Sequence, residues 1–243
     1  MTPPLQTEIR FPMTWGGRRK GAGRKLRRGR GPARHRPRPA LASRFPVHVT
    51  VRVGSWIKRL RGFRMAAALR QAFARGCVRQ DFRICQFSIQ GNHVHLICEA
   101  ASADALSRGM QAFNVRFARA VNRALRRRGK VLAERHHQEI LRTPRQVRNA
   151  LCYVLQNARR HCESTAGWPG GVDPFSSARY FDGWRVAPAL PALADGLAPV
   201  VSPARTWLLT TGWRRHGLIA LHEMPAAGRP REMESSAQVR RCR

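Results

Sequence analysis

The run Gly91-Asn92-His93-Val94-His95-Leu96-Ile97-Cys98-Glu99 decides the fold of this chain. Side chains of a β-strand alternate between its two faces, so His93 and His95 lie together on one face. The apolar residues at positions 94, 96 and 98 point the other way, into a core. Two imidazoles side by side on a rigid element suit a divalent metal, which takes neutral imidazole ligands. The simpler interpretation is a half-buried strand whose exposed face carries two histidines.

The segment just before this run predicts its partner strand. Residues 83–90 alternate in polarity and put Cys85, Phe87 and Ile89 on one face. Gly91-Asn92 then makes a tight turn, so the two strands form an antiparallel hairpin.

Two more strands are expected. Valine stands at every second position from 47 to 53, with His48 facing away from the valine row, where it approaches the site or contacts a phosphate. Residues 130–142 predict a strand from 131 to 141 that contains His136-His137. Adjacent residues of a strand face opposite ways, so these two histidines do not share one metal. Glu99, at the end of the histidine strand, is expected to be a solvated charge and not a ligand.

Three helices are expected between and after these strands. The first covers roughly 65–76, and Ser102 caps a second, with one apolar stripe, that runs to about residue 128 and stops at Gly129. Thr143-Pro144 is a start signal for a third helix, to about Cys162. The order strand, helix, hairpin, helix, strand, helix predicts an α+β fold, an antiparallel sheet with helices packed on it.

The charge of the chain indicates a polyanionic partner. Lys and Arg total 46 of 243 residues against 13 Asp and Glu, a formal net charge of +33, so nucleic acid comes before a membrane surface. No apolar run approaches 18–20 residues and the N-terminus has no apolar signal core, so we expect a cytoplasmic, nucleoid-associated protein. The six cysteines show no C-x-x-C pair and are expected to be thiols, several of them buried.

Composition divides the chain into five parts. Residues 1–44 are expected to be a disordered basic arm, 45–165 the folded domain, 166–203 an irregular linker, 204–221 a small basic helical element, and 222–243 a disordered tail. The arm and the arginine-rich helices supply the expected phosphate contacts. The candidate DNA-binding residues are Arg18, Arg19, Lys20, Arg24, Lys25, Arg27, Arg28, Arg30, Arg116, Arg119, Arg123 and Arg160.

A tyrosine and an asparagine on the third helix are candidates for the same site. Tyr153 and Asn157 are four residues apart and share a face, away from the apolar stripe of that helix. Two imidazoles and the Asn157 side-chain oxygen are a set that holds Mg²⁺ or Mn²⁺ with positions left for a phosphate. Tyr153 is then placed to attack phosphorus, provided that a metal or base helps its hydroxyl. The alternative for Tyr153 is a surface aromatic stacked on a strand or a base.

Asn92, the His93-Val94-His95 pair, the Tyr153-x-x-x-Asn157 helix and the arginine-rich flanks together resemble the single-tyrosine HUH transposases, and among them the REP-associated tyrosine transposases. The resemblance covers about residues 45–165. It implies an HUH sandwich derived from a ferredoxin-like fold. It also implies that His93, His95 and Asn157 bind Mg²⁺ or Mn²⁺ and that Tyr153 cleaves single-stranded DNA and keeps its 5′ phosphate. The chain departs from the family at Gly91, where the family usually has proline before the asparagine.

The implied activity is DNA transposition on hairpin-forming single strands of palindromic repeats, by a monomer or a homodimer. A catalytically silent nucleic-acid binder that keeps the fold is the alternative. A histidine-triad hydrolase needs a third histidine where Ile97 stands, and a zinc deaminase needs H-x-E with C-x-x-C, which the chain lacks.

Overall fold

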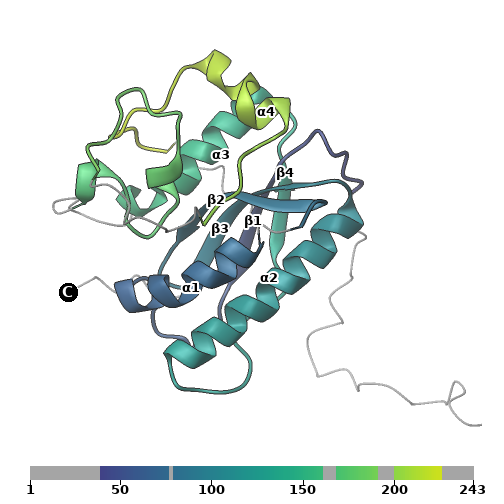
Figure 1. Cartoon of the computed structure of the whole chain (residues 1–243), viewed down its shortest axis with the longest axis vertical. Helices are drawn as coiled ribbons and strands as arrows, with labels where there is room; N and C mark the ends of the chain where they lie inside the picture. The colour runs from purple at the N-terminus through teal and green to yellow at the C-terminus, as the bar shows by residue number, and fades with distance from the viewer. Residues whose placement is uncertain (1–38, 77–78, 161–167, 191–199, 226–243) are drawn as a thin grey trace, which may run out of the picture. The chain divides into compact units, whose positions relative to one another are not determined.

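Four strands pair into one antiparallel sheet whose faces are both covered (Figure 1). The computed structural model describes residues 39–76, 79–160, 168–190 and 200–225, and the expected basic arm lies outside them up to residue 38. The strand order is β2-β3-β1-β4, and every neighbouring pair is antiparallel. The strands are β1 (Val47–Arg52), β2 (Phe82–Ile89), β3 (His93–Ala100) and β4 (His137–Ile140). The α+β class predicted from the sequence is confirmed.

Each face of the sheet has its own apolar core. Helices α1 (Phe63–Gly76) and α2 (Ala103–Ala124) cover the valine face, where Val49, Leu96 and Phe113 are fully buried. Helix α3 (Pro144–Gln156) and the short helix α4 (Trp207–Thr210) cover the opposite face (Figure 1). The histidine face of the hairpin is therefore the face under α3.

A β-bulge in β2 overturns one expectation from the sequence. The pairing of β2 with β3 shifts between Ile84 and Gln86, so Cys85 is the extra residue. A one-residue slip sends the following side chains to the other face. Cys85 accordingly packs in the core under α3, whereas Phe87 and Ile89 pack in the core under α1 and α2. The prediction that these three residues share a face is wrong.

Local capping explains where the helices begin and end. Ser102 accepts a hydrogen bond from the backbone of Ala105, and Thr143 with Gln146 forms a capping box at the start of α3, so both predicted caps are confirmed. Helix α2 ends at Ala124, four residues before the predicted end, because Arg126 takes a left-handed φ of 49°. Helix α3 ends at Gln156 and continues as a 3-10 turn over Asn157–Arg160, short of the predicted Cys162.

The predicted strand over 131–141 is much shorter than expected. Only His137–Ile140 pair along β1, and upstream of them a single bridge joins Val53 to Leu132. His136 lies just outside the strand, and the segment between residues 126 and 136 is held by turns around the positive-φ residues Arg126 and Gly129.

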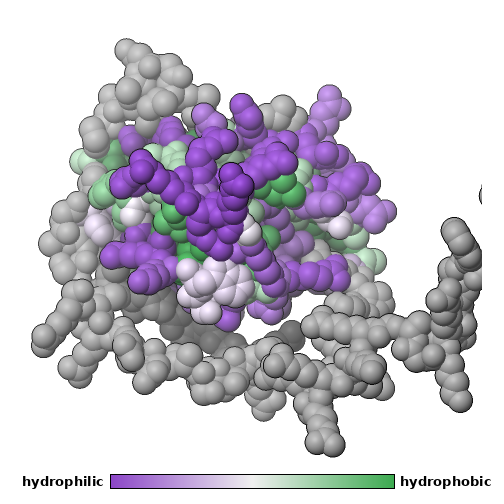
Figure 2. All heavy atoms as spheres, turned by 90° about the horizontal axis from the view of Figure 1, so that it is seen from below, coloured by the Kyte–Doolittle hydropathy of each residue, from purple (hydrophilic) through white to green (hydrophobic). Residues whose placement is uncertain are grey.

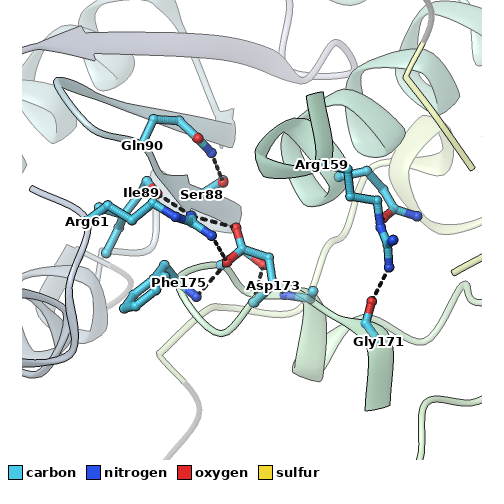
Figure 3. Close-up of polar contacts among 11 residues, drawn as sticks. Arg61, Ser88, Ile89, Gln90, Arg159, Gly171, Asp173 and Phe175 are labelled. Atoms are coloured by element: carbon cyan, nitrogen blue, oxygen red, sulfur yellow. Dashed lines mark hydrogen bonds and ion pairs between the residues drawn. The ribbon is translucent and has the colours of Figure 1, made fainter. Parts of the chain in front are cut away.

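Residues 175–177, in the segment predicted to be an irregular linker, lie against the edge of β2, and Asp173 just before them is seen in Figure 3. Ser176 bridges Ser88, and Ser177 binds the backbone of Phe87. Arg61 forms a bidentate ion pair with the buried Asp173, with N–O distances of 3.0 and 2.7 Å. The edge of β2 that this segment covers is thus not exposed to another chain.

The segment from residue 200 to residue 225 fastens α3 to the sheet. Arg148 of α3 makes a bidentate ion pair with Glu223, at 2.7 and 3.0 Å, and also binds the carbonyls of Gly217 and Leu218. The Arg148 guanidinium lowers the pKa of Glu223. Gln156 binds the carbonyl of Ala220 at 2.7 Å.

Glu99 belongs to this attachment, which corrects the expectation of a solvated charge. Its side chain is buried and accepts hydrogen bonds from the backbone N–H groups of Arg205 and Thr206, at 3.0 and 2.7 Å, and from Arg83. Losing these partners would leave an unpaired buried charge, which is energetically costly. Glu99 therefore holds the backbone at residues 205 and 206 against β3.

The cysteines within the described residues are thiols and not half-cystines. Cys85, Cys98 and Cys152 are buried and form no disulfide, as predicted. Burial is the first cause that raises the pKa of Cys152 to about 12, so its thiol stays protonated.

Candidate active site

The face of the sheet under α3 carries a row of polar side chains across all four strands. Residues that pair across antiparallel strands share a face. Thr50 pairs with His95 on one side and with His137 on the other, and His95 pairs with Ser88. Sequence analysis missed Ser88 and Thr50, because only the register of the strands brings them beside His95.

The two histidines of the hairpin strand meet at their Nε2 atoms, 2.9 Å apart. His93 Nδ1 lies 2.7 Å from Asn92 Oδ1, which is an acceptor, so Nδ1 carries the proton. Nε2 of His93 then presents its lone pair toward His95. His93 and His95 could therefore hold a cation, and a neighbour that orients a ligand histidine through its other nitrogen is usual at metal sites.

His48 and Thr50 of β1 hold the second histidine from its other side. Nδ1 of His95 lies 3.2 Å from Nε2 of His48 and 3.1 Å from Oγ1 of Thr50. Burial, together with the His137 and His93 imidazoles, lowers the pKa of His48 to about 4, so His48 is neutral at pH 7. His48 therefore approaches the site, which is one of the two roles expected for it.

Tyr153 reaches this cluster from α3. Its ring centroid lies 5.0 Å from that of His95 and 5.8 Å from that of His48, both in edge-on arrangements. The phenol is half-buried, whereas its apolar neighbours Cys152 and Val154 are fully buried. The structure thus brings Tyr153 together with the histidine pair.

Asn157 is buried with 1% of its surface exposed, and neither Oδ1 nor Nδ2 of its amide has a hydrogen-bond partner. A buried amide without partners is costly in a folded protein, by about 1–3 kcal/mol, and such groups commonly mark functional sites. Asn157 follows Tyr153 by one helical turn, at the start of the 3-10 turn that continues α3. Among the described residues no cluster of three His, Cys, Asp or Glu side chains could hold a metal ion.

A family model described as "Transposase IS200 like" matches residues 42–139. This part of the chain is therefore similar to the IS200-like transposases. The match includes His93 and His95 and ends before α3 begins at Pro144. No curated protein matches the chain. The solved structures that match include a REP-associated tyrosine transposase bound to a REP hairpin. The two sequences are 17% identical, and the alignment covers 70% of this chain and 92% of that chain with a TM-score of 0.48.

The arginines expected to bind DNA do not all lie near His93 and His95. Arg116, Arg119 and Arg123 lie on α2, which covers the opposite face of the sheet from His95. Arg160 lies in the 3-10 turn after α3, and its side chain is outside the described part of the chain. The eight basic residues from Arg18 to Arg30 also lie outside the described residues, and their role stays a prediction.

None of the described helices is long and apolar enough to cross a membrane.

Proposed function

We propose that this chain is a single-tyrosine strand transferase that cleaves and rejoins hairpin-forming single-stranded DNA. The observation that carries the proposal is the approach of Tyr153, from α3, to the His93–His95 pair on β3. The similarity to the IS200-like transposases supports DNA as the substrate. The net charge of +33 supports a phosphate backbone as the partner.

The proposed chemistry is an exchange of one phosphate ester for another. Tyr153 Oη attacks the phosphorus of a DNA linkage as the bond to the 3′ oxygen breaks. The 5′ phosphate stays on the tyrosine, and the phenol proton ends on the released 3′ hydroxyl. A second 3′ hydroxyl reverses the step and rejoins the strand. Each bond that forms replaces one of the same kind, so no external energy source is needed.

The residues fit a divalent cation, with His93 and His95 as nitrogen ligands through Nε2 and Asn157 as the third ligand through Oδ1. The unpartnered amide of Asn157 and the facing Nε2 atoms support this set. Bound Mg²⁺ or Mn²⁺ would draw charge from the scissile phosphate. Imidazole nitrogen is a better ligand for Mn²⁺ than for Mg²⁺, so the set favours Mn²⁺. Asn92 and Thr50 would keep the two rings oriented.

Asn157→Leu separates the proposed ligand role from a structural one. Leucine has a similar volume and removes an unpaired buried amide, so metal-free protein should gain about 1 kcal/mol of unfolding free energy. Mn²⁺ should raise the melting temperature of the wild type and raise that of the variant far less. Thermal unfolding with and without Mn²⁺ checks both effects. A variant that Mn²⁺ stabilises as much as the wild type places the third ligand elsewhere.

Cleavage of a labelled hairpin tests the function directly. Single-stranded DNA with an imperfect hairpin, incubated with the full chain and Mn²⁺ or Mg²⁺, should yield a covalent protein–DNA adduct on a denaturing gel. A chelator should prevent the adduct, and an unstructured strand of equal length should yield less of it. The alternative function, a catalytically silent binder, predicts hairpin binding without any adduct at any metal concentration.

A further inference from the structure

Trp56 is a large aromatic side chain that is held rigidly and yet half exposed. Its indole N–H donates a hydrogen bond of 2.7 Å to the carbonyl oxygen of Lys130, while 50% of its surface remains exposed. The ring covers Gly54 so closely that a Cβ added there would meet ring atoms at 2.1 Å. One side of the ring therefore lies on backbone, and the side chain keeps a fixed position without burial in the core.

Two basic side chains lie close to this indole group: Arg127 at the carbonyl that accepts the indole N–H, and Lys130 over the ring. Arg127 donates through both terminal nitrogens, at 3.2 Å, to the same Lys130 carbonyl that receives the indole N–H. Nζ of Lys130 lies 6.0 Å from the centre of the ring. Neither residues 52–62 nor residues 126–133 contain an Asp or Glu, and Lys58 and Arg59 are exposed. Aromatic and positive groups thus occur together here without a compensating carboxylate within these two segments.

This group lies at the end of the sheet where the histidine strand begins. Arg52 pairs with His93, and the next residue, Val53, binds the backbone of Asn92 at 3.0 Å. Four residues of extended chain span at most about 14 Å, which limits the backbone distance from Arg52 to Trp56. The loop between α2 and β4 is at the bottom of Figure 1, and Figure 2, seen from below, shows a face covered largely by hydrophilic side chains.

We propose that Trp56, Arg127 and Lys130 form a stacking site, the Trp56 platform, for one base of single-stranded DNA beside the cleaved linkage. The proposal rests on the strand-transferase function above and adds a contact with a base. Every base has a π face, so stacking on an aromatic ring binds single strands without reading sequence, and the adjacent cations bind the phosphates. Arg52, which pairs with His93 and stands four residues before Trp56, is exposed and adds a further positive charge.

Binding of two matched probes tests the platform without any cleavage. One probe is a hairpin with a single-stranded flank of thymidines, and the other has abasic sites in that flank. Full-length Trp56→Ala should bind the thymidine probe about 5- to 150-fold more weakly than the wild type, measured by anisotropy with a chelator at fixed salt. It should bind the abasic probe like the wild type. Trp207→Ala is the matched control, because Trp207 is 49% exposed and lies under Arg215, and it should change neither affinity by more than about twofold.

Equal affinity of Trp56→Ala and wild type for the thymidine probe overturns the platform, and so does an equal loss on both probes. A second experiment needs no variant, so misfolding of Trp56→Ala cannot affect it. Wild-type protein is photocrosslinked to a probe that carries 5-iododeoxyuridine in the single-stranded flank. The crosslink should map to Trp56 by mass spectrometry, and crosslinks confined to other residues contradict the proposal. Wild-type protein that shows the base-dependent binding but forms no adduct refutes the strand-transferase function and leaves the platform standing.

Discussion

Tyr153→Phe should abolish the covalent protein–DNA adduct while the affinity for a hairpin stays within about twofold of the wild type. The change removes only the hydroxyl, and the phenyl ring keeps its edge contacts with His95 and His48. Loss of a nucleophile removes the chemical step, so the rate of adduct formation should fall by at least about 10⁴-fold. Denaturing gels measure the adduct, and anisotropy measures the binding.

The chain offers a natural control for this experiment, because it has only two tyrosines. The other, Tyr180, lies in a 3-10 turn and its hydroxyl accepts a hydrogen bond from Arg70 at 3.3 Å. Tyr180→Phe should form the adduct at the wild-type rate. An adduct of normal yield in Tyr153→Phe, or its loss in Tyr180→Phe, would show that Tyr153 is not the nucleophile.

His95→Ala should lower the rate of cleavage by more than about 100-fold, and added Mn²⁺ should not restore it. His95 is a proposed ligand, and it also links the neighbouring imidazoles, because His93 contacts its Nε2 and His48 its Nδ1. Changing a residue that only orients a metal ligand costs about 10- to 100-fold in activity, so removing a ligand should cost more than that. Cleavage rates across a Mn²⁺ titration provide the measurement.

His216→Ala is the control for the loss of an imidazole, since His216 is exposed at the end of a 3-10 turn near the C-terminus. It should cleave at the wild-type rate. Full activity of His95→Ala at high Mn²⁺ would mean that this ring supports the fold of the site and does not bind the metal.

Local patterns in the sequence were sufficient to predict most of the sheet and the helix caps. Alternating valines define β1, Ser102 and Thr143 define helix starts, and the two histidines share a face, because each of these depends on residues close in sequence. The predicted end of α2 was four residues too late. Arg126 adopts a left-handed conformation there, and the residues next to it in the sequence give no sign of it.

Features that depend on distant parts of the chain could not be predicted in this way. The bulge at Cys85 shows only in the pairing of β2 with β3. The burial of Glu99 depends on backbone donors of Arg205 and Thr206, more than a hundred positions away. For the candidate site, the sequence predicted the histidine pair and Tyr153, which the structure brings close together, whereas Thr50 and Ser88 beside His95 emerged only from the strand register.

The attachment of α3 by the last described segment has a consequence for the timing of synthesis. Arg148 and its partner Glu223 are 75 positions apart. At about 5–20 residues per second, a ribosome needs about 4–15 s to travel between them. During that interval the helix that carries Tyr153 exists without the segment that fastens it, and its outer apolar side is exposed to water. In a newly made chain, the helix that carries Tyr153 can therefore be fastened by Glu223 only when translation of the described region is almost finished.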